Sequence, residues 1–135
     1  MFLSLLIKYS TETEGSNYGA KLTVGALTAI ASTGKSTIGT GSSQTDDRNA
    51  SGIGIKYDMG GGLTIAASAT EVEDTADTSA GENEKYTSNI GEVVYTVAPG
   101  LKAKVTYTDY EYKDGSVGVG DDSGQITQLT ISASF

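Results

Sequence analysis

The sequence contains no cysteine, histidine or tryptophan, and its 135 residues include a single proline. Without cysteine and histidine the chain cannot form a disulfide framework, the usual kind of zinc site, or a Ser-His-Asp or Cys-His catalytic apparatus. Basic residues are scarce too: nine stand against seventeen acids, a net charge of −8, which argues against binding to nucleic-acid phosphates. We therefore expect no enzyme, no cofactor, no metal site and no nucleic-acid partner.

Long hydrophobic runs are also missing. The longest apolar stretch near the start, Phe2 to Ile7, is far too short for a membrane helix of about 20 residues, and no basic residue precedes it as in a signal peptide. Hydrophobic content is only 37%, while glycine occurs eighteen times. This composition favours strands with one apolar and one polar face over a chain with a large packed core.

Apolar and polar residues alternate along most of the chain. Near the C-terminus, for example, Leu129 and Ile131 alternate with Thr130 and Ser132, a period of two that indicates a strand and not a helix. The same alternation predicts an all-β, antiparallel protein of one domain with seven strands. They lie near residues 2–10, 18–32, 51–59, 63–73, 86–98, 101–113 and 125–135.

Charged residues in the bodies of these strands, away from the long connections, keep to the polar positions. The residues concerned are Lys8, Lys21, Lys56, Asp58, Glu92, Lys102 and Lys104. Random placement would put about half of them on the other face, because side chains alternate between the faces of a strand. We therefore expect one face of the sheet to be free of charge through the body of every strand.

The connections between the predicted strands alternate in length. Short turns are expected at 11–17, 60–62 and 99–100, and long polar connections near 34–49, 75–84 and 114–124. Tight turns at one end of a sheet and large loops at the other are typical of a transmembrane β-barrel, and this count puts the C-terminus at the short-turn end. Most of the acids lie in or beside the long connections. They could form a solvated surface, bridge divalent cations to lipid headgroups, or act as a weak electrostatic filter.

The chain resembles the C-terminal part of a subunit of the Gram-negative outer-membrane porins. The resemblance rests on the closing TISASF with its terminal aromatic Phe135, and on the runs IKYSTETEGSNYGAKLTVG, GIGIKYDMGGGLTIAAS and VVYTVAPGLKAKVTYTDYEY. It implies a transmembrane barrel of about sixteen strands, of which this chain supplies a part, with tyrosines at the membrane interfaces. It also implies a homotrimer that lets small hydrophilic solutes diffuse passively across the outer membrane.

The resemblance assigns roles to individual residues. The seven charged strand residues would line the pore, with a net-positive wall that modestly favours anions. The barrel-assembly machinery would recognise the last strand through Leu129, Ile131, Ala133 and Phe135. The apolar face would contact outer-membrane lipid.

Two features leave alternatives open. Bacterial barrels have even strand numbers, and the seven predicted strands together with the missing export signal favour a porin-like fragment without its N-terminal half. A barrel built by several chains is a further option. The main alternative is a cell-surface structural or adhesive β-protein, in which the apolar face packs on another sheet as a soluble sandwich. An outer-membrane enzyme barrel is the weakest alternative, since histidine is absent.

Overall fold

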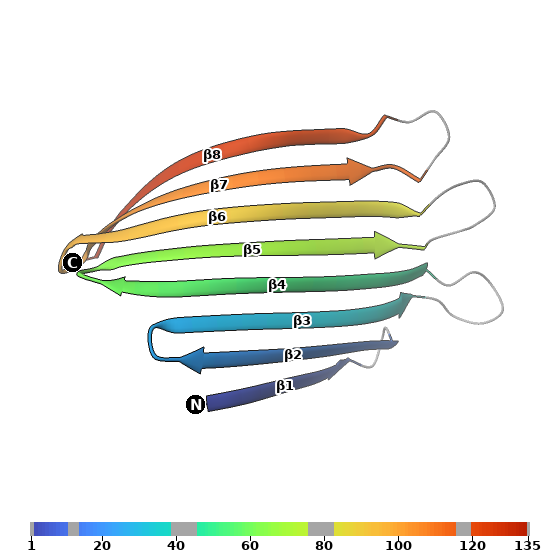
Figure 1. Ribbon diagram of the computed structural model, residues 1–135. Coiled ribbons are helices and arrows are strands. Elements are labelled where there is room, and N and C mark those ends of the chain that lie inside the picture. The colour runs from blue at the N-terminus through green and yellow to red at the C-terminus, as the bar shows by residue number, and fades with distance from the viewer. Residues whose placement is uncertain (1, 11–13, 39–45, 76–82, 116–119, 135) are drawn as a thin grey trace.

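The computed structural model describes residues 2–10, 14–38, 46–75, 83–115 and 120–134. These residues form a single antiparallel sheet whose eight strands follow one another in chain order (Figure 1). The strands are β1 (Phe2–Ser10), β2 (Glu14–Val24), β3 (Leu27–Ile38), β4 (Asp46–Gly60), β5 (Leu63–Asp74), β6 (Glu84–Ala98), β7 (Leu101–Lys113) and β8 (Asp122–Ala133). Within the described ranges no helix is long and apolar enough to cross a membrane.

The prediction of one strand over 18–32 is wrong, because this segment is a hairpin. Val24 pairs with Leu27, so the chain reverses through Gly25 and Ala26, and Gly25 has a φ of 58°. A two-residue hairpin turn needs a positive φ of this kind, which glycine adopts without steric cost. The apolar positions also pass from even numbers before the turn to odd numbers after it, as with Leu22 and Ala29.

The extra hairpin changes which end of the sheet carries each connection. Turns at 25–26, 61–62 and 99–100 lie at one end, which we call the short-turn end, and both chain termini lie there too (Figure 1). The predicted position of the C-terminus is confirmed, since the Ser134 N–H donates to the Gly100 carbonyl over 2.8 Å. The predicted strict alternation fails at the start, because β1 ends and β2 begins at the opposite, long-connection end, only a few residues apart in the chain.

Several strands extend further than predicted toward the long-connection end. β3 continues to Ile38 and β4 begins at Asp46, so the connection expected over 34–49 shrinks to 39–45. Those residues, together with 76–82 and 116–119 of the other two long connections, lie outside the described ranges. Polar and charged residues that were expected in loops therefore lie on strands.

The sheet has a single layer and encloses no hydrophobic core. Among the described residues no hydrophobic side chain is buried, and Ile53, Leu129 and Ile131 are 66%, 67% and 70% exposed. The accessible surface of 9733 Å² exceeds the ~6,700 Å² typical of a folded monomer of this mass. Within the described residues, neither face of the sheet is covered by a second layer.

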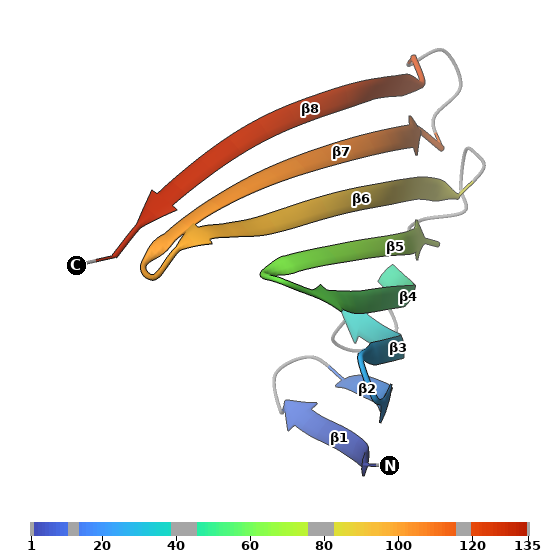
Figure 2. The ribbon, with the colours of Figure 1, turned by 60° about the vertical axis from the view of Figure 1, so that its left-hand side comes forward.

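The sheet is curved, as Figure 2 shows. We call the face that carries Ile53, Ile55 and Tyr57 the banded face, and the face that carries Gly54 and Lys56 the polar face. Along most of β6 and β7, side chains of the polar face are more buried than their neighbours on the banded face, as the burial alternates from residue to residue. Because side chains crowd on the inside of a curve, the polar face is concave.

The tight turns predict a difference between two glycine variants. Gly100 has a φ of 79°, and a Cβ there would lie 2.5 Å from the Ser134 carbonyl oxygen, whereas a Cβ at Gly25 would contact nothing within 4 Å. Gly25→Ala should thus lower the free energy of unfolding by about 1 kcal/mol, the cost of a left-handed conformation, and Gly100→Ala by more than about 2 kcal/mol. Equilibrium urea unfolding measures both losses, and equal losses would contradict the contact at Ser134.

Candidate functional site

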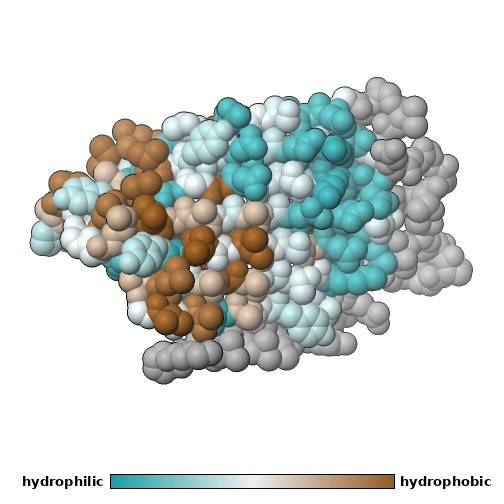
Figure 3. Space-filling model, viewed as in Figure 1, coloured by the Kyte–Doolittle hydropathy of each residue, from teal (hydrophilic) through white to brown (hydrophobic). Residues whose placement is uncertain are grey.

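The banded face is divided into an apolar and a charged part. Its hydrophobic side chains gather over the half of the sheet near the short turns, and hydrophilic ones cover the half toward the long connections (Figure 3). The charged part holds Lys35, Asp47, Glu71, Glu73, Lys85, Asp109, Glu111 and Lys113. The prediction of a charge-free face therefore holds only for the apolar part, because the strands continue beyond it.

The boundary between the two parts runs obliquely across the sheet. In the row of paired residues through Ala31, Ile53 and Ala69, the members on β6 to β8 are polar: Asn89, Asp109 and Gln125. One row closer to the short turns, the row stays apolar or aromatic through Tyr107 on β7 and becomes polar only at Thr127 on β8.

The slope of this boundary can be measured from the register. Going from the short turns toward the long connections, the last apolar or aromatic residue of the banded face is Tyr18 on β2 and Leu129 on β8. The row of Tyr18 reaches β8, six strands away, at Ser123, and Leu129 lies six residues closer to the short turns than Ser123. The boundary thus shifts by about one residue per strand. With about 3.3 Å per residue and about 4.8 Å between strands, it makes an angle of about 35° with the hydrogen-bond direction.

Four tyrosines on the banded face follow the same slope. Tyr107 lies five strands after Tyr18 and four residues closer to the short turns, and Tyr95 lies two strands after Tyr57 and two residues closer. All four side chains are between 42% and 52% exposed. They form two parallel lines, one along the boundary and one nearer the short turns.

The predicted pore-lining residues share the polar face. Lys21 lies in the row of Gly54, Lys56 is one row closer to the short turns on β4, and Lys104 is a further row closer on β7. These three lysines therefore form a belt parallel to the oblique boundary, at the height of the apolar part. Asp58, Glu92 and Lys102 lie within one row of this belt.

Lys8 and Phe135 do not belong to the belt as described. Lys21 pairs with Ser4 of β1, whereas Lys8 lies four residues further along β1 and pairs with Asn17, so its position is outside the belt. On β8, Leu129, Ile131 and Ala133 share the banded face, whereas Phe135 lies outside the described residues. The polar face is not uniformly polar either, since Ile30 and Ile126 are exposed on it.

Ion pairs differ between the belt and the rest of the sheet. In the belt, the Lys104 Nζ lies 3.1 Å from Glu92 Oε2, whereas Lys56 has no carboxylate within 4 Å among the described residues. Toward the long connections, Arg48 pairs with Asp74 at 3.0 Å on the polar face. This pairing of Arg48 could not be predicted from the sequence, because its partner is 26 residues away.

Ion pairs also shift titrations on the charged part of the banded face, outside its apolar part. The Thr37 hydroxyl donates to Asp47 Oδ1, and with Lys35 at 3.1 Å it lowers the pKa of that carboxyl from its usual value. The Lys85 ammonium lies 2.9 Å from Glu71 Oε2, which raises the pKa of Lys85. The lowered pKa of Asp47 and the raised pKa of Lys85 keep these two groups charged near neutral pH.

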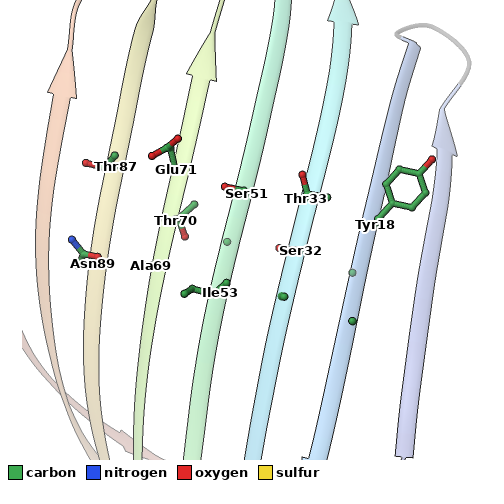
Figure 4. A pocket seen from close by; sticks show the side chains of 14 residues that line it. Tyr18, Ser32, Thr33, Ser51, Ile53, Ala69, Thr70, Glu71, Thr87 and Asn89 are labelled. Carbon is green, nitrogen blue, oxygen red and sulfur yellow. The ribbon is translucent and has the colours of Figure 1, made fainter.

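A shallow hollow crosses the boundary of the banded face over β2 to β6 (Figure 4). It is lined by small residues such as Ala20, Ala31 and Ala69, and by Tyr18 and Glu71. The hollow follows from the small side chains and lies on the open convex face. Among the described residues no group of three acidic side chains is placed to hold a metal ion.

The structure also brings together three tyrosines that the sequence did not connect. Tyr86, Tyr110 and Tyr112 lie on the polar face near the long connections, whereas the resemblance implied tyrosines at the membrane interfaces. The period-two pattern alone assigns them to this face, but only the pairing of β6 with β7 brings them together. We call this group the tyrosine patch.

The Lys104–Glu92 pair makes a testable difference between two lysines of the belt. Lys104→Glu should lower the free energy of unfolding by about 0.5–1 kcal/mol more than Lys56→Glu, because it places a second carboxylate beside Glu92. The double variant Glu92→Lys/Lys104→Glu should recover that loss. Equilibrium unfolding of all three variants measures it, and a double variant no better than Lys104→Glu would show that the two side chains do not interact.

Comparison of the chain with models of protein families, with curated proteins and with solved structures finds no match in any of the three.

Proposed function

We propose that this chain forms part of the wall of a porin in the outer membrane of a Gram-negative bacterium. The banded face contacts lipid, and the polar face lines a water-filled pore. Small hydrophilic solutes cross the pore by passive diffusion, down their own gradient, with no cofactor.

The observation that carries this proposal is the oblique boundary of the apolar part. A flat slab of lipid crossed by tilted strands imposes a boundary that slopes across the hydrogen-bonded rows by the tilt angle. The measured slope of about 35° falls in the range of about 35–45° for strands of outer-membrane barrels. The two parallel tyrosine lines support the same interpretation, since aromatic residues gather at the two interfaces of such a barrel.

The concave polar face supports a pore lining. Its strands carry mostly Gly, Ser, Thr and Lys, which leave room and hydrogen-bonding groups for water. An eight-stranded barrel has an interior only wide enough to be filled by side chains, so small and charged residues would fill it poorly. We therefore infer a wider barrel to which these eight strands contribute one section.

The free edges of the sheet fit this inference. β1 pairs only with β2, and β8 only with β7, among the described residues. Unpaired edges are costly in lipid, because no water satisfies their backbone groups. We infer that further strands continue the barrel at both edges. The resemblance to porins adds two inferences: three copies associate, and the assembly machinery binds the C-terminal strand.

A soluble adhesive or structural protein remains the second candidate from the sequence. Such a sandwich would cover the apolar part of the banded face with another sheet. The described residues form one sheet, so the second sheet would have to come from elsewhere. A covering sheet would also have to end along an oblique line, for which a sandwich offers no physical reason.

Adjacent residues on β4 test the lipid-facing assignment. Ile55→Arg should lower the free energy of unfolding from lipid vesicles by about 2–4 kcal/mol, since it places a guanidinium near the bilayer midplane. Lys56→Glu, one residue away on the other face, should change it by less than about 1 kcal/mol. Urea titration of the protein folded in vesicles measures both values, and similar losses would contradict the assignment of the two faces.

Ion selectivity tests the pore-lining assignment, with the protein purified from membranes in its native assembly. In planar bilayers under a potassium chloride gradient, the wild type should conduct with a modest preference for chloride. Lys56→Glu should shift the reversal potential toward potassium, because it removes a positive charge from the wall and adds a negative one. Lys113→Glu makes the same charge change on the banded face and should shift it less. Absence of any current would overturn the proposed function itself.

A further inference from the structure

We propose that the tyrosine patch, together with Glu84 and Asp122, is a binding site for organic cations, such as alkylated amines, on the concave polar face. The permeation role of this site rests on the proposed pore, whereas binding itself does not.

The patch is assembled by three neighbouring strands. Tyr86 on β6 pairs directly with Tyr112 on β7, and Tyr112 pairs in turn with Asp122 on β8. Tyr110 lies one row closer to the short turns, opposite Ser88 and Gly124. Directly paired residues of an antiparallel sheet have Cβ atoms about 5 Å apart, so Tyr86 and Tyr112 are neighbours on this face, and Tyr110 lies in the adjoining row.

The three tyrosines remain accessible from solvent, whereas the sheet beneath them is buried. Ser88, at its base, is 6% exposed, which shows that the surrounding side chains close over the sheet there. Tyr86 remains 39% exposed, and Tyr110 and Tyr112 are half-buried. Part of each tyrosine is thus accessible from the polar face.

Tyr110 also has a structural role that must be separated from binding. A Cβ at Gly124 would lie 2.9 Å from the Tyr110 hydroxyl oxygen and 3.0 Å from its Cε1, so the ring covers this glycine of β8. Such packing accounts for Tyr110, but it does not account for the aromatic pair formed by Tyr86 and Tyr112. Those two residues occupy positions that carry Gly, Ala and Val elsewhere in the same row.

Negative charge surrounds the rings. The Tyr110 hydroxyl donates to Asp122 Oδ2 over 3.4 Å, and Glu84 is close enough to act electrostatically on the Tyr112 hydroxyl. The nearest cation on this face, Arg48, is held by Asp74 at 3.0 Å. Lys85 and Lys113 lie on the banded face, where they pair with Glu71 and Glu111.

This combination selects for a particular ligand chemistry. Aromatic faces attract cations through their quadrupole, and organic cations add apolar contact with the rings. The two carboxylates favour positive charge over a neutral sugar that would stack on the same rings. A hydrated metal ion would gain little from the aromatic surface.

The proposal is tested by binding to the detergent-solubilised protein, with tyrosine rings labelled for NMR and tetraethylammonium chloride as the probe. Sodium chloride at equal ionic strength serves as the blank. Saturable shifts are expected at Tyr86, Tyr110 and Tyr112. The ring signals of Tyr18, Tyr57, Tyr95 and Tyr107, on the other face, should not move.

Variants then separate the contributions. Tyr112→Leu should weaken binding about twofold to fivefold, whereas Tyr107→Leu, on the same strand but the opposite face, should not. Glu84→Gln/Asp122→Asn keeps all rings and should weaken binding by a similar factor, which guards against misfolding of the leucine variant.

Other outcomes would overturn the proposal. Equal shifts at all tyrosines would indicate non-specific binding, and shifts produced by maltose but not by tetraethylammonium would indicate a sugar site. The experiment also separates this proposal from the porin proposal. Binding without any channel current leaves the cation site standing, and a chloride-preferring channel without binding removes only the site.

Discussion

The structure depends on backbone hydrogen bonds between neighbouring strands of a single-layer sheet. These bonds lie in the plane of the sheet, so they place no requirement on what contacts either face. Within the described residues no hydrophobic side chain is fully buried, so these residues supply little of the apolar burial that normally offsets the entropy of ordering. The apolar part of the banded face is therefore left for contact with surroundings beyond these residues. Its oblique boundary is the shape that a flat apolar slab crossed by tilted strands would produce.

Much of the fold follows from the sequence because a strand has a simple period. The strand predicted over 101–113 has the observed bounds of β7, and the parity of Lys56 and Ile55 alone assigns them to opposite faces. The hairpin of β2 and β3 was missed for a specific reason. Its turn contains one glycine and no proline or asparagine. Ala26 also continues the apolar parity of Val24, so the alternation runs on past the end of β2 to Ala26. Only the change of parity at Leu27 marked the reversal.

The arrangement of the candidate site could be predicted only in part, because its main features belong to several strands at once. Alternation places the lysines on one face, but it does not say that Lys104 meets Glu92 while Lys56 meets no carboxylate of the described residues, since this depends on the register between β6 and β7. The slope of the apolar boundary is likewise invisible within any single strand, where the pattern merely stops at a different residue. The same holds for Tyr86 and Tyr112, which are 26 residues apart in the chain and become neighbours only through pairing.

On the polar face, the lysine belt and the acids of the tyrosine patch lie at different distances from the short turns. The lysine belt lies level with the apolar part of the opposite face, so in a membrane it would be backed by lipid of low dielectric and its field would be weakly screened. The tyrosine patch with Glu84 and Asp122 lies beyond that level, so in a membrane aqueous salt would reach it from the long-connection end. A solute entering from that side would meet an aromatic, negative surface first and a positive belt afterwards. An organic cation would then be held before a barrier of its own sign, whereas a small anion would pass a weak barrier to reach a favourable belt, so the same wall can retain one class of solute while conducting the other.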